Sequence, residues 1–297
     1  MDKDLTIFIP TFKRNALLNK CIISVKNSIK NINISYEIII VNENYEKINS
    51  LNDINIKVLN FDREVLPCYA MYYALLNSEG KYFLRIDDDN EINVDLISLL
   101  YNYIINNDRV AYCGALGIGD DNNITNPGTI LSKHLKLSLR PMNINNEVHE
   151  VDLVDNVYIV DKKLINIDTF YNVCKFFPWS LEDAYDQIRL KKLGYKIVIL
   201  SSAVTTHHRH RKSLNTTQVY YYARSKLIFY IFSFNFKFTK SILLALIGLL
   251  YIAYIYKSDI KNIKDLLLVY FNYIKGIIDG IKFVNDGNVK NLYDNIK

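Results

Sequence analysis

Apolar runs of strand length alternate with segments of helical periodicity along most of this 297-residue chain. The runs predict strands over 5–9, 37–41, 56–59, 81–86, 110–113, 151–160 and 195–200. Apolar residues at steps of three and four predict helices over 15–29, 66–77, 94–105 and 181–193. Pro10 is expected to end the first strand, and the polar stretch 114–148 to form loops with short strands. Because strands that alternate with helices build a sheet with helices on both faces, we predict a Rossmann-like α/β fold with a mostly parallel sheet.

The composition changes near residue 225, where a strongly apolar region begins. Ser241–Tyr256 is a run of 16 residues without a formal charge, and apolar residues from Ile260 to Ile281 recur at steps of three and four. A membrane-spanning helix needs roughly 20 apolar residues, so the uncharged run leaves open whether it spans a bilayer, enters it or packs on the protein. We predict an α/β domain over 1–225 and an apolar helical appendage over 226–297 that lies on a membrane or packs on a neighbour.

Formal charge is distributed unevenly along the chain. Residues 226–297 hold ten Lys and five Asp, which accounts for the whole net charge of +5 and leaves residues 1–225 neutral. A neutral body argues against a nucleic-acid-binding protein, whereas a basic apolar tail suits the cytoplasmic side of a cell membrane with anionic lipids. The four cysteines form no CxxC pair, so neither a zinc site nor a disulfide framework is expected. No signal peptide is expected at the N-terminus.

Three consecutive carboxylates, Asp87, Asp88 and Asp89, follow the predicted strand 81–86. Ligands of open α/β sheets bind beyond the carboxyl ends of the strands. Adjacent carboxylates repel one another unless a cation neutralises them, and oxygen ligands suit Mg²⁺ or Mn²⁺, which also bridge nucleotide phosphates. A solvated acidic turn that caps the next helix is the structural alternative. The position directly after an apolar strand favours a metal and nucleotide site.

A second acidic segment, Glu182-Asp183, begins the predicted helix 181–193. Carboxylates in a first helical turn are favoured by the helix dipole, which is a sufficient structural reason for them. The functional alternative is a general base that takes the proton of an acceptor hydroxyl. Trp179, the only tryptophan, precedes the pair and is equally compatible with a sugar-stacking platform and a core aromatic residue.

A basic cluster follows the last predicted strand, with the sequence His207-His208-Arg209-His210-Arg211-Lys212. Its cations could hold a diphosphate, and one histidine could bind the metal. A basic surface segment is the structural alternative. Farther along the chain, Arg224 could bring one more cation to the phosphates.

These motifs, in this order, resemble glycosyltransferase family 2 over roughly residues 4 to 225. Pro10, Thr11 and Phe12 are similar to the "VPxYN" start of the family, which lines the nucleotide pocket. The segment Gly80–Asp89 is similar to "GeYilflDdD", which contains the metal-binding DxD motif. The segment from Trp179 to Ile197 resembles "fxxEDxDlxxRlxxxGyki", His207 the late histidine, and Tyr222-Ala223-Arg224 the "yyxxRN" stretch, with Ser225 in place of the usual Asn.

The resemblance implies a GT-A fold and inverting transfer from a nucleoside-diphosphate sugar. It implies that Asp87 and Asp88 contact the nucleotide, and that Asp87, Asp89 and His207 bind Mn²⁺ or Mg²⁺. Asp183 of the Glu182-Asp183 pair would be the catalytic base. With the apolar tail, the resemblance favours a membrane-proximal acceptor, such as a polyprenyl-phosphate or a lipid-linked glycan.

The chain departs from the family pattern in two places. The second strand ends in Asn42-Glu43 where the family has an Asp that reads the nucleobase, so Asn42 or Glu43 is expected to take that role. Met71-Tyr72 stands where the family has an Arg-Asn pair.

Two other functions are compatible with these motifs. A sugar nucleotidyltransferase also uses carboxylate-bound Mg²⁺, but the segment from Pro10 to Asn15 lacks the glycine-rich loop it needs. A catalytically inactive, membrane-associated scaffold of the same fold is compatible with both departures.

Overall fold

The computed structural model describes residues 3–44, 46–48, 53–131, 138–139, 147–179, 181–208, 215–234, 238–257 and 260–285. The chain forms two compact units. The first contains Met1–Val65, Tyr69–Ile167 and Asp186–Arg209, and the second contains Leu66–Cys68, Asp168–Tyr185 and His210–Lys297. These units are defined by contacts between residues, whereas the predicted boundary at residue 225 separates two functional domains. The predicted boundary therefore stays a prediction.

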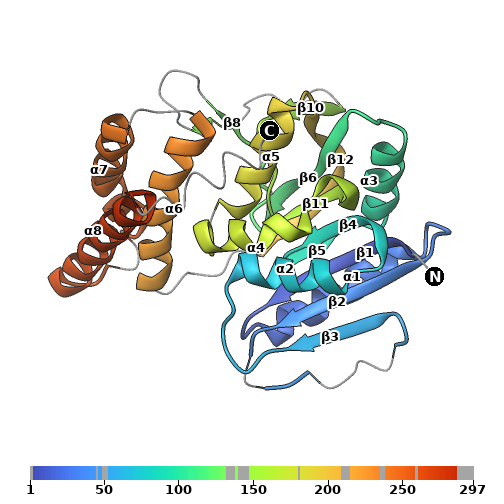
Figure 1. Ribbon diagram of the computed structural model, residues 1–297. Helices are drawn as coiled ribbons and strands as arrows, with labels where there is room; N and C mark the ends of the chain where they lie inside the picture. Colours follow the sequence, from blue (N-terminus) through green and yellow to red (C-terminus); the bar gives the residue numbers. More distant parts are fainter. Residues whose placement is uncertain are drawn as a thin grey trace. The chain divides into compact units, whose positions relative to one another are not determined.

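The first unit is built on one large mixed sheet, shown from blue to green and yellow in Figure 1. Among the described residues the sheet has ten strands, eight of them in the order β10-β12-β6-β11-β4-β1-β2-β3, with β5 paired to β12 and β7 to β6. These strands are β1 (Lys3–Thr11), β2 (Tyr36–Asn42), β3 (Ile56–Asn60), β4 (Gly80–Ile86), β5 (Asn90–Ile92), β6 (Val110–Gly119), β7 (Ile124–Asn126), β10 (Val148–Val151), β11 (Val157–Asp161) and β12 (Lys196–His207). A separate pair joins β8 (Ile130–Leu131) to β9 (Ser138–Leu139).

The direction of the strands brings several carboxyl ends to one edge of the sheet. Strand β1 is parallel to β2 and β4, and β12 is parallel to β6. Strand β11 is antiparallel to both β4 and β6, so β4 and β6 point the same way. The carboxyl ends of β1, β4 and β12 therefore share an edge, which is where a ligand of such a sheet is expected.

The expectation that Pro10 ends the first strand is wrong. Strand β1 continues to Thr11, and Pro10 is paired with Val41 of β2. The ladder between β1 and β4 ends at Phe8, so the N–H that proline lacks is not needed on that side. The extra residues carry Thr11 to the edge of the sheet.

Strands β1 and β4 approach each other closely at Gly80. A Cβ atom at this position would lie 2.2 Å from the backbone nitrogen of Thr6. The backbone nitrogen of Gly80 donates to Thr6 Oγ1, and that hydroxyl donates to the buried Glu37 Oε1 at 2.6 Å. Only glycine fits here without moving a strand, which explains the glycine at the start of the strand that carries the acidic residues.

Helices cover one face of the sheet as the periodicity predicts. Helices α1 (Asn15–Ile29) and α3 (Leu96–Ile105) place their apolar stripes on alternate residues of the strands. The stripe of α1 is fully buried at Leu18, Ile22 and Val25. Burial of a large aliphatic side chain contributes roughly 1.5–3 kcal/mol, so this face supplies much of the stability of the unit.

The other face of the sheet packs on α2 (Pro67–Asn77) and the later part of α5 (Glu182–Lys192). Tyr158 of β11 donates a hydrogen bond to Met71 of α2, and Tyr112 of β6 donates one to Asp186 of α5 at 2.8 Å. These buried phenols have partners for their hydroxyl groups, as buried tyrosines require. The predicted covering of both faces is confirmed.

Several elements differ from the sequence analysis. The predicted strand 151–160 is divided between β10, which ends at Val151, and β11, which begins at Val157. Strand β12 extends to His207, seven residues beyond the predicted end at residue 200, and β6 runs to Gly119. Helix α4 (Ile167–Phe176) was not predicted, although Phe170, Val173 and Cys174 recur at helical spacing. A short 3₁₀ turn, η1 (Lys162–Leu164), precedes it. Helix α5 ends near Gly194, whose φ of +90° is the left-handed conformation expected after a helix.

The second unit contains three long helices, α6 (Thr216–Phe234), α7 (Phe238–Ile255) and α8 (Ile263–Asn285), drawn from orange to red in Figure 1. They share a core that includes Leu227, Ala245 and Tyr273. Helices α6 and α8 pack closely because Gly276 presents no side chain, and a Cβ there would lie 2.3 Å from the carbonyl oxygen of Tyr220. Within the described part of the chain, no helix is both long and apolar enough to cross a membrane.

Candidate active site

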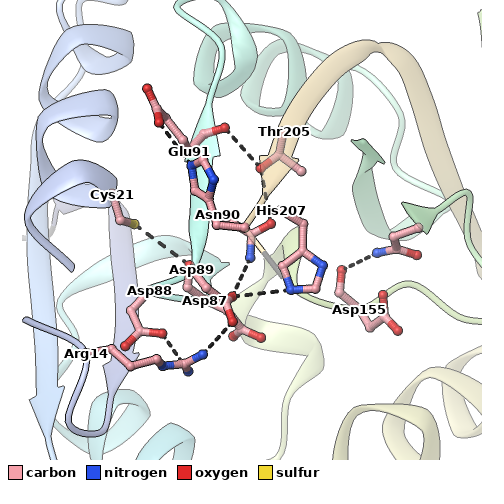
Figure 2. A network of polar contacts seen from close by, with 12 residues as sticks. Arg14, Cys21, Asp87, Asp88, Asp89, Asn90, Glu91, Asp155, Thr205 and His207 are labelled. Carbon is pink, nitrogen blue, oxygen red and sulfur yellow. Dashed lines mark hydrogen bonds and ion pairs between the residues drawn. The ribbon is translucent and has the colours of Figure 1, made fainter. Parts of the chain in front are cut away.

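The three aspartates form a turn directly beyond the carboxyl end of β4 (Figure 2). The turn is closed by a hydrogen bond from the backbone nitrogen of Asn90 to the carbonyl oxygen of Asp87 at 3.0 Å. The backbone nitrogen of Asp87 in turn donates to the carbonyl oxygen of Asn156 at 3.1 Å. Asn90 then begins β5, which pairs with the end of β12, so both ends of the turn are held by the sheet.

Asp88 is the most deeply buried of the three carboxylates, with no exposed surface. Its Oδ2 accepts a hydrogen bond from Thr11 Oγ1 at 2.7 Å. Its Oδ1 lies 2.6 Å from Arg14 Nη2, an ion pair without hydrogen-bond geometry. Burial raises the pKa of Asp88 to about 7, although Arg14 and Thr11 favour the charged form. The neighbouring Asp89 and Asp87 act in the same direction as burial.

Asp89 lies close to two basic side chains, those of Arg14 and His207. Its Oδ2 accepts a hydrogen bond from Arg14 Nη1 at 2.5 Å, and its Oδ1 lies 3.6 Å from His207 Nε2. Asn90 Nδ2 also donates to Oδ1 at 3.1 Å. Burial acts to raise the pKa of Asp89, but His207 and Arg14 outweigh it, so the pKa is lowered. Asp89 is therefore better prepared than Asp88 to remain ionised.

Two arginines that the sequence analysis did not assign to the site neutralise the acidic turn. Arg14 stands at the start of α1 and bridges Asp88 and Asp89 (Figure 2). Arg85, near the end of β4, is almost fully buried and donates from Nε to Asp87 Oδ1 at 2.9 Å. The sequence carries a signal for both, because each arginine lies within five residues of the carboxyl end of a predicted strand.

His207 reaches the turn because β12 is longer than predicted. In the sheet His207 lies opposite Asn90 of β5 and Gly119 of β6, at the same edge as the acidic turn. The backbone nitrogen of the next residue, His208, donates to the carbonyl oxygen of Asp89 at 2.8 Å. The structure thus brings together Thr11, the three aspartates and His207, five residues that the sequence analysis assigned to one site.

The remaining residues predicted to bind the nucleotide lie at the ends of β1 and β2. Pro10 and Phe12 flank Thr11 and are half-buried. Asn42 is buried and its Nδ2 donates to Glu46 O and Asn60 Oδ1, at 2.9 and 2.8 Å.

Glu43 is also buried, and its Oε2 accepts a hydrogen bond from the backbone nitrogen of Val65 at 2.8 Å. Both Asn42 and Glu43 therefore hold the loops around the end of β2. Their assignment to nucleobase recognition stays a prediction.

The predicted base and its neighbours belong to the second unit. Glu182 is buried and Asp183 is half-buried in the first turn of α5. Trp179 is half-buried, and its carbonyl oxygen accepts a hydrogen bond from Ser225 Oγ at 3.4 Å. Arg224 Nη2 donates to the carbonyl oxygen of Lys175 at 2.8 Å. The roles assigned to these four side chains stay predictions.

Two predicted phosphate-binding residues, Arg209 and Arg211, lie outside the described residues. Within the described ranges, no three His, Cys, Asp or Glu side chains converge closely enough to hold a metal ion. The four cysteines are buried and free.

Comparison with known proteins identifies similar folds. The model of a family described as Glycosyl transferase family 2 matches residues 6–157, a range that includes the whole acidic turn. A comparison with curated protein sequences finds no match.

Three solved structures share the fold at low identity. The crystal structure of GalNAc-T7 with UDP, GalNAc and Mn²⁺ has a TM-score of 0.53 at 12% identity over 77% of this chain. The chain spans 50% of that structure. TarS 1–349 from S. aureus in complex with UDP-GlcNAc has a TM-score of 0.58 at 13% identity, with 92% of this chain and 81% of TarS covered. A second crystal structure of S. aureus TarS 1–349 has a TM-score of 0.55 at 14% identity, with 97% of this chain and 88% of TarS covered.

Proposed function

The chain belongs to glycosyltransferase family 2, and we propose that it transfers a sugar from a nucleoside-diphosphate sugar to an acceptor close to a membrane. Its fold is similar to that of GT-A glycosyltransferases, in agreement with the fold predicted from the sequence. The observation that carries the proposal is the acidic turn at the carboxyl edge of the sheet, where Thr11, Arg14 and His207 converge on Asp88 and Asp89.

The proposed donor is a nucleotide-sugar. TarS was solved with UDP-GlcNAc and GalNAc-T7 with UDP, which supports a nucleoside diphosphate as the leaving group here. Pro10, Thr11 and Phe12 would line the nucleotide pocket together with Asp87 and Asp88. The basic residues Arg209, Arg211 and Arg224 are the proposed partners of the diphosphate, because guanidinium groups bind phosphate oxygens in pairs.

A divalent cation fits the chemistry of the turn. Asp87 and Asp89 offer hard oxygen ligands and His207 a nitrogen ligand, a set compatible with Mn²⁺ or Mg²⁺. Arg14 pairs with both Asp88 and Asp89, so these two carboxylates already face one positive charge. A bound cation would supply Lewis-acid stabilisation of the diphosphate as it departs.

The protein's own residues would perform two further tasks. Thr11, Arg14 and Arg85 fix the carboxylates of the turn in place, so little reorganisation is needed when charge develops on the leaving group. Asp183, with Glu182 beside it, is the proposed base that receives the proton of an acceptor hydroxyl as that oxygen attacks the anomeric carbon. Attack from the face opposite the leaving group would invert the configuration of the sugar.

The proposed acceptor is a polyprenyl-phosphate or a lipid-linked glycan on the cytoplasmic side of the cell membrane. The net charge of +5 of the chain resides in residues 226–297, which contain the apolar helices α7 and α8. Basic apolar helices bind the surface of a bilayer that contains anionic lipids. A location at the membrane would raise the local concentration of a lipid-linked acceptor.

A donor screen tests the proposed activity. Purified protein is incubated with common nucleotide-sugars and membrane extract, with Mn²⁺, Mg²⁺ or a chelator, and the nucleoside diphosphate released is measured. We expect release from at least one donor only when a divalent cation is present, and little release by the Asp89→Asn variant. Release from no donor, or equal release by the variant, would refute the proposed enzyme.

A further inference from the structure

The three long helices of the second unit use their apolar residues differently. Large apolar side chains of α6, such as Leu227, Ile228 and Phe229, are buried. Helices α7 and α8 each bury one face, with Ala245 and Ile252 on α7 and Val269 and Tyr273 on α8. Each of these two helices also has a second apolar face, which the described residues leave open to solvent.

The second face of α7 contains six large apolar residues, each 47% to 78% exposed. They recur at steps of three and one, so they form a single stripe along the helix. These residues are Leu243, Leu246, Ile247, Leu250, Tyr251 and Tyr254.

The second face of α8 also contains six, each 41% to 66% exposed. The expectation that one stripe from Ile260 to Ile281 makes up the contact face of this helix is only partly right, because Ile277 is buried while Ile263 is exposed. The exposed residues are Ile263, Leu267, Leu268, Phe271, Ile274 and Ile278.

Lysines accompany both stripes. Three exposed lysines of α8 stand on the same side of the helix as Phe271. Lys275 lies about one turn from Phe271, Lys264 about two turns and Lys282 about three turns. On α7, the exposed Lys240 lies two turns before Ile247.

The acidic residues of these helices have other positions. Among the described residues of α7 and α8, these are Asp265 and Asp279, and both are half-buried. Asp265 accepts a hydrogen bond from the backbone nitrogen of Lys261 at 2.9 Å, and Asp279 accepts one from Tyr220 at 3.0 Å. The two stripes therefore present apolar and positively charged groups with few exposed negative ones.

We infer that the exposed stripes of α7 and α8, with their lysines, form a docking surface for an anionic lipid bilayer. The apolar side chains would enter the region between headgroups and acyl chains, and the lysines would contact anionic headgroups. A second copy of the chain is the weaker candidate, because a two-fold contact would place the same lysines against each other.

This inference rests on the proposed function only for its purpose, which is to hold the enzyme beside a lipid-linked acceptor. The docking itself is independent of donor, metal and catalytic residues. It can therefore fail while the transferase activity stands, and the reverse also holds.

Vesicle sedimentation of the full chain, without donor or acceptor, tests the docking. Vesicles of phosphatidylcholine alone are compared with vesicles that also contain phosphatidylglycerol. We expect binding to the anionic vesicles, and a loss of affinity of ~10-fold or more in the Leu250→Gln/Phe271→Gln double variant, because two large apolar contacts are removed. Lys264→Gln is expected to weaken binding by roughly fivefold.

Matched controls come from α1 of the first unit. Ile23 is 61% exposed and Lys20 is exposed as well, so Ile23→Gln and Lys20→Gln change the same residue types on another helix. Both controls should bind the anionic vesicles like the parent protein, and thermal unfolding should show that all variants are folded.

Three outcomes would overturn the inference. The first is no binding to either kind of vesicle, and the second is an equal effect of the control and test variants. The third is concentration-dependent self-association that the Leu250→Gln/Phe271→Gln variant abolishes without vesicle binding by the parent, which would show that a second copy covers the surface.

Discussion

The chain has two acidic segments with proposed catalytic roles, and they are supported in different ways. The turn Asp87–Asp89 receives partners from separate parts of the chain, because Thr11 ends β1, Arg14 directly precedes α1 and His207 ends β12. The pair Glu182-Asp183 lies in the first turn of one helix, where the helix dipole favours carboxylates.

The two acidic segments therefore differ in how much of the tertiary structure each one needs. A buried carboxylate such as Asp88 is costly, and only an assembled tertiary structure can provide the cations and hydroxyls that offset the cost. A carboxylate in a first helical turn is tolerated by local structure alone. Variants of the turn should therefore affect stability, cation binding and activity together, whereas a variant of Asp183 should affect the chemical step alone.

The largest effect is expected for Asp89→Asn. Because this carboxylate is the proposed ligand of the cation and contacts Arg14 and His207, transfer should fall by about 1,000-fold, equivalent to ~4 kcal/mol of transition-state stabilisation. Initial rates at saturating donor, and Mn²⁺ titration followed by calorimetry, measure the loss. The exposed Asp108 provides the matched control, and Asp108→Asn should retain activity. Unchanged metal affinity in Asp89→Asn would contradict the assignment.

Asp183→Asn should lower kcat by about 100-fold with a hydroxyl acceptor, which is the contribution expected of a general base. Donor and metal binding should remain intact, and this separates Asp183 from the acidic turn. With a phosphate acceptor, which is already anionic, the loss should be much smaller. Comparable activity of the variant and the parent on both acceptors would exclude Asp183 as the base.

Arg14→Ala should destabilise the metal-free protein by ~2 kcal/mol, because two carboxylates lose a charged partner. Differential scanning calorimetry with a chelator measures the loss, and Mn²⁺ should restore more stability to the variant than to the parent. Arg14→Lys keeps the charge but cannot bind both carboxylates in the same way, so an intermediate result is expected. If metal-free Arg14→Ala unfolds at the same temperature as the parent, Arg14 does not support the turn.

The smallest effect is a pH dependence. The pKa of Asp88 is raised to about 7 in the folded protein, so between about pH 4 and 7 the folded state holds a proton that the unfolded state releases. The contribution of Asp88 to the free energy of unfolding is present at low pH and is lost as the pH rises from about 4 to 7. Asp88→Asn should remove the dependence, so its stability relative to the parent should increase by ~1 kcal/mol or more from pH 5 to pH 8 without metal. Parallel pH profiles of the two unfolding temperatures would contradict this account.

Much of the fold follows from local sequence patterns. Helix α1 begins and ends where its apolar stripe predicts, and β2, β3 and β4 agree with the predicted runs to within a residue or so. The family was also evident from the sequence, because the motifs stand in the family's order and the family model matches residues 6–157.

The partners of the acidic turn could not be read from local patterns. Arg14 and Asp89 are 75 residues apart, and Thr11 and Asp88 are 77 apart, so their contacts exist only once the strand order is set. His207 reaches the site because β12 continues along β6 and β5, which periodicity over a short window does not reveal.

The sequence by itself determined most of the elements, the family and which residue types could perform the chemistry, because apolar periodicity and short motifs are local properties. The tertiary structure decided that Asp88 is buried, that Arg14 bridges it to Asp89, and that α7 and α8 each keep an apolar face exposed. Burial and charge pairing depend on what surrounds a side chain in space, and that environment is assembled from segments far apart in the chain.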